Sequence, residues 1–168
     1  QGGEAVLYDG NAKLSAEDLK AKFDEGAKVT VVLGELKKLD LTGVELAIIS
    51  PGISLEAPFV AVIDEAKIPI CSEIELAYHS TKGKLVAITG TNGKTTTTAL
   101  TGEIMKKFCE SVFVVGNIGD PYALHALETE DNSITVAEIS SFMLETIVDF
   151  RPNVSAITNI TPDHLDRH

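Results

Sequence analysis

Cysteine, long apolar runs and basic residues are all scarce in this chain. The two cysteines, Cys71 and Cys109, lie far apart and give neither a metal-binding spacing nor a disulfide framework. We therefore expect small buried side chains in a protein of the reducing cytoplasm. No apolar run approaches the length that crosses a membrane. The N-terminal QGGEAVLYDG also lacks the basic and apolar segments of a secretory signal, so we expect a cytoplasmic protein without a membrane partner.

The shortage of basic residues argues against a further class of function. The 14 Lys and Arg residues stand against 25 Asp and Glu residues, which gives a net charge of −11. Neither half of the chain offers the basic surface that nucleic-acid binding needs. The chain also has no G-x-G-x-x-G after an expected strand, which disfavours a dinucleotide-dependent oxidoreductase.

Strand and helix patterns alternate along the whole chain, as is typical of parallel β/α units in an α/β fold. A helix is expected to begin after Ser15 and end near Asp24, and another to begin after Ser72 with Glu75 in the capping-box position. The polar break around Lys82 predicts a domain boundary there. The expected strands are 5–8, 29–33, 46–50, 68–71, 85–89, 112–115, 134–138 and 154–159. The other main helices are expected at 57–66, from 94 through 105 or beyond, and at 122–127.

The most informative stretch, KLVAITGTNGKTTTT, joins a β-rich apolar run to a glycine turn and a helix. Gly90 and Gly93 let backbone N–H groups approach an anion, and the helix N-terminus adds unpaired donors and a positive dipole end. Lys94 can reach the β- and γ-phosphates, and the Thr95 hydroxyl can ligate Mg²⁺. Ile88 stands where the general motif has its first glycine. The shortened pattern in its strand–loop–helix context predicts a site for a nucleoside triphosphate.

Polar residues follow three other expected strands of the second half. Glu138 ends one strand, and Asn117 follows another. Asp163 and His164 follow a third. Because ligands bind at the carboxyl ends of strands in α/β sheets, we expect these side chains to converge on the phosphate loop. Glu138 could hold Mg²⁺ there, directly or through water, although each residue alone could equally be a solvated, capping or turn residue.

Taken together, these motifs resemble those of the Mur ligase family. The resemblance rests on AITGTNGKTTTT, VVGNIG, AEISSFMLE and ITNITPDHLDRH, and on LYDGN, IISPGI and SEIELAY in the first half. It implies a Rossmann-like, UDP-substrate-binding domain at residues 1–82 and the start of a P-loop NTPase-like, ATP-binding central domain at residues 83–168. Within the family it points to the ATP-dependent ligases that add D-glutamate to UDP-N-acetylmuramoyl-L-alanine in peptidoglycan synthesis.

The resemblance also implies roles for individual residues. The catalytic residues would be Lys94, Glu138 and His164, and the Mg²⁺ ligands Thr95, Glu138 and His164. The ATP phosphates would be held by Gly90, Thr91, Asn92, Gly93, Lys94, Thr95 and Thr96. The uridine-nucleotide substrate would be bound by Asp9, Ser50, Pro51, Gly52 and Asn117.

Because such ligases have three domains, the resemblance predicts that this chain is a piece that cannot complete the reaction alone. The first strand of the UDP-binding domain, a carbamylated lysine, the adenine contacts and the D-glutamate-binding domain would lie outside it. The full-length enzyme is expected to be a monomer that acts on small molecules. Two alternatives stay open: another Mur ligase or a folylpolyglutamate synthase-like ligase, and an ATP-binding module that ligates nothing.

Overall fold

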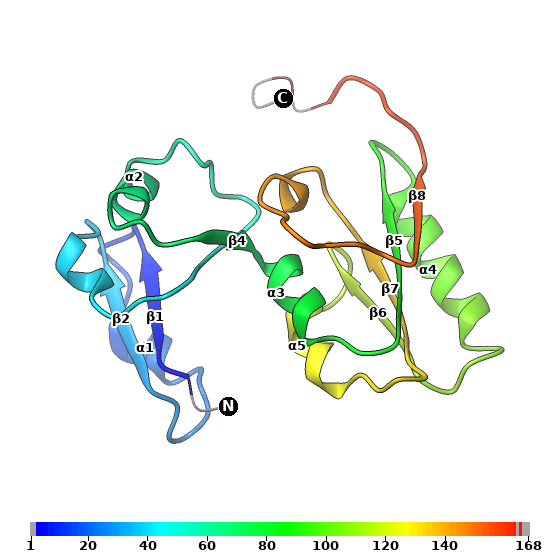
Figure 1. Ribbon diagram of the computed structural model, residues 1–168, viewed down its shortest axis with the longest axis horizontal. Coiled ribbons are helices and arrows are strands. Elements are labelled where there is room, and N and C mark those ends of the chain that lie inside the picture. The colour runs from blue at the N-terminus through cyan, green and yellow to red at the C-terminus, as the bar shows by residue number, and fades with distance from the viewer. Residues whose placement is uncertain (1–2, 164, 166–168) are drawn as a thin grey trace. The chain divides into compact units, whose positions relative to one another are not determined.

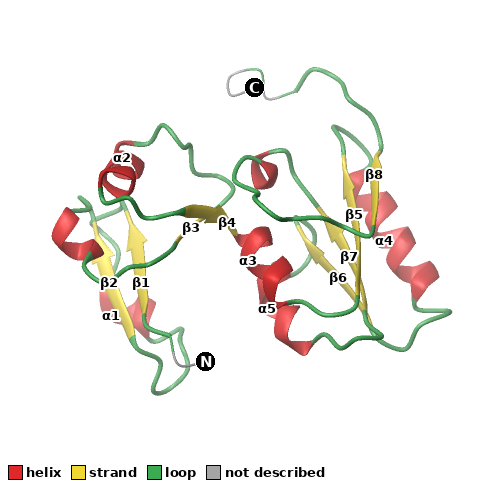
Figure 2. Cartoon of the chain, viewed as in Figure 1, coloured by secondary structure: helices red, strands yellow, loops and turns green. Residues whose placement is uncertain are grey.

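The structure, a computed structural model, describes residues 3–163 and 165 and divides into two compact units (Figure 1). Unit 1 comprises residues 1–47 and 53–70, and unit 2 comprises residues 48–52 and 71–168. Both units combine helices with parallel strands, so the predicted α/β class is confirmed (Figure 2). The functional boundary between residues 82 and 83 stays a prediction. In the part of the chain that is described, no helix is both long and apolar enough to span a membrane.

Unit 1 is built on the parallel strands β1 (Ala5–Asp9) and β2 (Val29–Leu33). Helix α1 (Ala16–Lys20) connects them, and the predicted cap is present, since Ser15 Oγ accepts the N–H of Asp18 at 3.2 Å. The prediction that this helix reaches residue 24 is wrong. Because α1 buries none of its residues, no packing sustains it beyond its first turns.

The rest of unit 1 packs a helix beside these strands. Phe59 of this helix lies against Tyr8 of β1, with ring centroids 4.9 Å apart, next to a cluster centred on Leu36, Ile63 and Ile68. The remaining elements of unit 1 are η1 (Lys38–Leu41) and α2 (Pro58–Glu65). A separate two-stranded sheet of β3 (Ala47–Ile49) and β4 (Ile70–Ser72) lies where the chain passes between the units, and only Ala47 and Ile70 of these strands belong to unit 1.

Unit 2 contains a four-stranded sheet with the order β6-β7-β5-β8, and all its strands are parallel. The strands are β5 (Lys84–Thr89), β6 (Val112–Gly116), β7 (Ile134–Glu138) and β8 (Val154–Ile157). The central strands β5 and β7 are largely buried, whereas β8 is an exposed edge. Because the strands are parallel, their carboxyl ends share one edge of the sheet, which is where ligands bind in α/β folds.

Helices cover both faces of this sheet. On one face, α4 packs so closely that a Cβ on Gly102 would lie 2.3 Å from Val114 Cγ2. On the other face, Val115 belongs to a core cluster with Ile74 and Tyr122 of α3 and α5. These helices are α3 (Glu73–Ser80), α4 (Lys94–Met105) and α5 (Tyr122–His125), with the 3₁₀ turns η2 (Ala126–Glu128) and η3 (Phe142–Leu144).

Candidate functional site

Residues 90–93 form the turn between β5 and α4. The backbone φ is +133° at Gly90 and +82° at Gly93, conformations that residues with a side chain rarely adopt. A Cβ on Gly90 would lie 2.2 Å from Thr158 Oγ1 and 2.9 Å from Asn159 O, whereas a Cβ on Gly93 would meet nothing within 4 Å. Gly90 therefore allows the loop to lie in close contact with Thr158 and Asn159, and Gly93 leaves open space at the start of the helix.

The N-terminus of α4 presents unpaired backbone donors. Gly93 is the N-cap residue, no side chain caps the helix, and its first turn has no acidic residue. The first bonded N–H is that of Thr97, which donates to Gly93 O at 3.0 Å. Within the described residues, nothing accepts a hydrogen bond from the N–H groups of residues 93–96. Such a helix end attracts anions, because the unpaired donors add to the positive end of the helix dipole.

Lys94 adds a positive charge at this helix end. Its Nζ donates to the carbonyl oxygens of Gly90 at 2.7 Å and Thr91 at 3.0 Å, so the ammonium group is held over the turn. Both acceptors are neutral, and no described carboxylate forms an ion pair with this lysine. Thr95 and Thr96 are exposed in the same helical turn. The predicted phosphate-binding residues therefore form one continuous loop and helix start.

Glu138 lies at the carboxyl end of β7 and is only 1% exposed. Its Oε1 accepts from Asn117 Nδ2 at 3.0 Å, and the N–H of Asn117 donates to Glu138 O at 2.9 Å. The structure thus joins two of the predicted site residues. The other oxygen, Oε2, is buried and has no hydrogen-bond partner among the described residues. A buried carboxylate oxygen without a donor is costly, and a cation such as Mg²⁺ would satisfy it.

The alternation of side chains places Glu138 on the α4 face of the sheet. Val114 contacts α4 through Gly102 and lies opposite Val136 in the register of β6 and β7. Side chains two residues apart on a strand share a face, so Glu138 lies on the same face as Val136. The carboxylate therefore sits at the edge and on the face where α4 begins.

Sequence analysis missed the segment that holds the loop in place. Asn159, just beyond β8, accepts the N–H of Asn92 at 2.9 Å through Oδ1 and donates to Asn92 O at 2.8 Å through Nδ2. Its carbonyl oxygen accepts the N–H of Thr91 at 3.0 Å. Thr158 Oγ1 also donates to Asn92 O, at 2.7 Å. The pattern that could have found these residues is the polar TNIT sequence (158–161), which overlaps the end of the expected strand 154–159.

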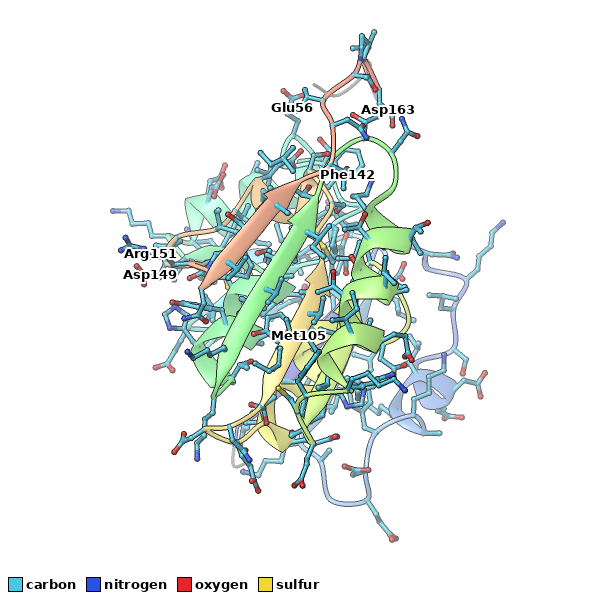
Figure 3. All side chains as sticks on the ribbon, turned by 90° about the vertical axis from the view of Figure 1, so that its right-hand side faces the viewer. Glu56, Met105, Phe142, Asp149, Arg151 and Asp163 are labelled. Atoms are coloured by element: carbon cyan, nitrogen blue, oxygen red, sulfur yellow. The ribbon has the colours of Figure 1, made fainter. Side chains whose placement is uncertain are left out.

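The last predicted residues of the site follow this segment. Asp163, labelled in Figure 3, lies beyond the carboxyl ends of β5 and β8. Met105, also labelled, marks the C-terminal end of α4, away from the phosphate loop. His164 lies outside the described residues, so its predicted role as a metal ligand stays a prediction. Asp163 therefore extends the polar groups at this edge of the sheet.

The predicted substrate contacts other than Asn117 lie in other parts of the chain. Asp9 is the last residue of β1, and its Oδ1 accepts the N–H of Asn11 at 2.8 Å, which shapes an exposed turn. Ser50, Pro51 and Gly52 follow β3 and begin a second turn. Both segments end strands, as predicted, and their binding of a uridine nucleotide stays a prediction.

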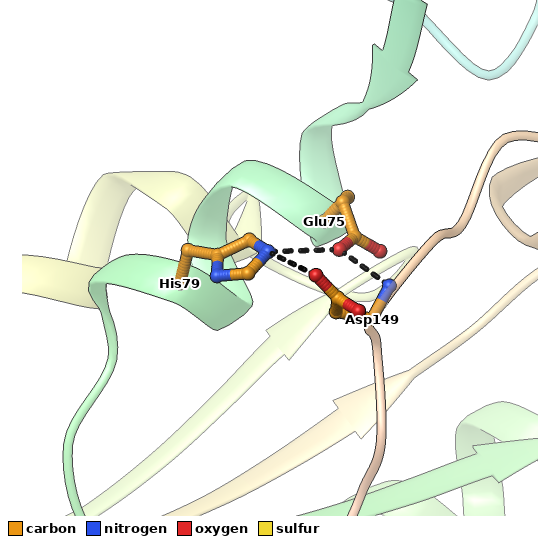
Figure 4. Close-up of side chains that lie close together, drawn as sticks. All are labelled: Glu75, His79 and Asp149. Carbon is orange, nitrogen blue, oxygen red and sulfur yellow. Dashed lines mark hydrogen bonds and ion pairs between the residues drawn. The ribbon is translucent and has the colours of Figure 1, made fainter.

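A cluster of Glu75, His79 and Asp149 brings three possible metal-ligand atoms within 4.8 Å of one another, as Figure 4 shows. Its geometry is that of a structural clamp, because Glu75 accepts N–H groups from Val148, Asp149 and Phe150 at 2.8–3.1 Å and a bond from His79 at 3.0 Å. Burial favours a raised pKa for Glu75, but these donors outweigh it and lower its pKa. The predicted cap at Ser72 is confirmed, since its Oγ accepts the N–H of Glu75 at 3.4 Å. The Glu75 carboxylate does not complete a capping box, because its oxygens accept from the backbone of residues 148–150.

Comparison with known proteins agrees with the geometry of unit 2. Residues 88–168 match the Mur ligase middle domain. The whole chain is 51% identical to the UDP-N-acetylmuramoylalanine–D-glutamate ligase of Lachnoclostridium phytofermentans over 168 residues, which are 100% of this chain and 37% of that protein. The chain belongs to the Mur ligase family.

Two further relatives carry the same name. The protein of Lachnospira eligens is 51% identical over 167 residues, and that of Caldanaerobacter subterraneus subsp. tengcongensis is 47% identical over 167 residues. Each comparison covers 99% of this chain and 37% of the relative. The Mur ligase chain described here thus spans little more than a third of the length of the curated relatives it matches.

Proposed function

We propose that unit 2 binds Mg-ATP at the carboxyl edge of its sheet. The observation that carries this proposal is the uncapped N-terminus of α4. The N–H groups of residues 93–96 have no partner among the described residues, the Lys94 ammonium lies over the turn, and a Cβ on Gly93 would meet nothing within 4 Å. These groups would hold the phosphates together with Gly90, Thr91 and Asn92, which shape the loop. Thr95, Glu138 and His164 would hold Mg²⁺, which when bound neutralises charge on the phosphates.

We further propose that the protein is an ATP-dependent ligase that adds D-glutamate to UDP-N-acetylmuramoyl-L-alanine in peptidoglycan synthesis. The names of the relatives and the extent of the identity support this assignment. The substrate carboxylate attacks the γ-phosphorus, the bond to ADP breaks, and an acyl phosphate forms. The amine of D-glutamate then attacks the acyl carbon, and the tetrahedral intermediate collapses with expulsion of phosphate.

In this reaction the chain supplies positioning and charge. The backbone donors at the start of α4 fix the phosphates for in-line attack, and Lys94 stabilises the charge that develops on the transferred group. Asp9 and residues 50–52 would bind the uridine nucleotide, and Asn117 would lie near it. Residues 1–82 would then form the substrate-binding domain and residues 83–168 the ATP-binding domain.

We also propose a cytoplasmic protein that works as a monomer on small molecules and binds neither nucleic acid nor membrane. The net charge of −11 supports the absence of a polyanionic partner. Both cysteines are free, which agrees with a reducing compartment.

The test of the ATP site compares Mg-ATP binding by the intact protein and its Lys94→Ala variant, measured by titration calorimetry. We expect the affinity to fall by about 10- to 100-fold, because charge-assisted hydrogen bonds to the phosphates are lost. Lys106→Ala is the matched control, since this lysine at the other end of α4 is exposed and pairs, among the described residues, only with Glu103. Equal affinities for Lys94→Ala and the wild type would refute the site.

Two turnover measurements test the ligase. Glu138→Gln keeps an acceptor for Asn117 but lacks the charge, so we expect the Mg²⁺-dependent activity to be lost while the circular dichroism spectrum is unchanged. The intact protein is then offered D-glutamate, L-alanine, L-lysine and diaminopimelate in turn. A preference for an amino acid other than D-glutamate would favour another ligase of this family. Mg-ATP binding without any turnover would favour a non-catalytic module.

A further inference from the structure

We propose that Asn159 is a positioning residue that fixes the phosphate loop by imitating a peptide group. Its side-chain amide forms with the backbone of Asn92 the pair of hydrogen bonds that a neighbouring β-strand would form. Oδ1 accepts the N–H of Asn92 at 2.9 Å, while Nδ2 donates to the carbonyl of the same residue at 2.8 Å. Of the common side chains, only Asn and Gln carry an acceptor and a donor in this planar arrangement.

These contacts continue the β5–β8 pairing beyond the end of both strands. The last regular bond joins the N–H of Thr158 to Thr89 O at 2.9 Å. Next, the N–H of Thr91 donates to Asn159 O at 3.0 Å, and the Asn159 side chain then takes over the role of the backbone. The close approach at Gly90 leaves no space for a Cβ between these segments. The loop is therefore attached to the sheet along its first half.

This attachment divides the backbone donors of the loop into two sets. The N–H groups of Thr91 and Asn92 are bonded to Asn159 and turn toward β8. The N–H groups of residues 93–96 have no partner among the described residues, so they are free to receive an anion. Asn159 thus selects which amides face a triphosphate, without touching the nucleotide itself. This inference rests on the proposed Mg-ATP site.

The structure supplies a matched control for this role. Asn153 occupies the opposite end of the same two strands, where its Oδ1 accepts the N–H of Leu85 at 2.8 Å. Asn153→Ala removes a comparable bond between a side chain and the backbone of β5, far from the loop in the register of the sheet. A loss of stability alone would therefore appear in Asn153→Ala and in Asn159→Ala alike.

The experiment measures Mg-ATP affinity by calorimetry, and KM for ATP against kcat, in the intact protein and its Asn159→Ala and Asn153→Ala variants. We expect Asn159→Ala to weaken Mg-ATP binding and raise KM about tenfold, with kcat affected much less, and Asn153→Ala to match the wild type. If the affinity of Asn159→Ala lies within about twofold of the wild type, or if both variants lose affinity equally, the positioning role is refuted.

Two further variants make the outcome decisive. Asn159→Asp retains the acceptor for the Asn92 N–H but sets a carboxylate against the Asn92 carbonyl, so we expect weaker Mg-ATP binding than in the wild type even if Asn159→Ala does not fold. Lys94→Ala distinguishes a failure of the proposed Mg-ATP site from a failure of the proposed role of Asn159. If Lys94→Ala loses Mg-ATP but the Asn159 variants do not, only the role of Asn159 is wrong. If the wild type binds no Mg-ATP, the proposed site and this inference both fail.

Discussion

The two glycines of the phosphate loop are expected to lose different amounts of stability on the same substitution. Gly90→Ala should destabilise unit 2, whereas Gly93→Ala should chiefly weaken Mg-ATP binding. Both residues have positive φ, +133° and +82°, so both variants carry backbone strain. The difference between them is what a new Cβ would meet.

The structure allows the two effects to be compared in size. An alanine in the left-handed region costs about 1–2 kcal/mol, and Gly93→Ala should cost no more than this, because its Cβ would meet nothing within 4 Å. At Gly90 the new Cβ would lie 2.2 Å from Thr158 Oγ1 and 2.9 Å from Asn159 O. Relief of this clash requires the loop to separate from β8, which sacrifices several hydrogen bonds of about 1 kcal/mol each. We expect Gly90→Ala to lose at least about 2 kcal/mol more than Gly93→Ala.

Gly93→Ala should weaken Mg-ATP binding although it costs little stability. The open space beside Gly93 is where we place the phosphates, so a methyl group there would obstruct the anion directly. Native-state hydrogen exchange of the β5 amides gives the stability of unit 2 alone, and calorimetry with Mg-ATP gives the affinity. If Gly93→Ala bound Mg-ATP like the wild type, or if both variants lost equal stability, this explanation of the loop would be wrong.

The remaining predictions concern buried and paired charges. Glu75→Gln should lower the unfolding free energy by about 1.5–3 kcal/mol, because backbone donors lose a charged acceptor, while the exposed Glu103→Gln should change it little in the same denaturant titration. Since the pKa of Glu75 is lowered from 4.5, its stabilisation is present above pH 4.5 and is lost as the pH falls through the folded pKa. His125 behaves oppositely: hydrogen bonds to Asp120 and Glu128 raise its pKa above 6.5, so its stabilisation is complete below pH 6.5 and is lost as the pH rises through the folded pKa. Unfolding free energies measured across this range should lose that slope in His125→Asn, and an unchanged slope would contradict the assignment.

Local sequence patterns were sufficient to predict much of the secondary structure of unit 2. The predicted helix 94–105 and strand 134–138 coincide with α4 and β7. The glycine turn explains why the helix starts where it does, and the apolar run explains why the strand lies buried in the centre of the sheet. The site residues that end strands, Glu138 and Asn117, could be predicted for the same reason.

What the sequence did not reveal depends on contacts between distant segments. Glu75 fits the local capping-box pattern, but its carboxylate binds backbone groups 73–75 positions away. Asn159 reaches a loop residue 67 positions away, which requires knowing that β8 is the neighbour of β5. The strand expected to reach residue 159 ends at Ile157 for the same reason, because the next two residues bind the loop. Sheet order decides these contacts, and no local pattern contains it.

Anion binding at the start of α4 can be observed directly by titrating the protein with Mg-ADP and following its backbone amide resonances. We expect the largest shifts on the N–H groups of residues 93–96, which have no partner among the described residues, and smaller changes at Thr91 and Asn92, whose N–H groups are bonded to Asn159. Unchanged resonances at the start of α4, or larger shifts elsewhere in the chain, would contradict this expectation.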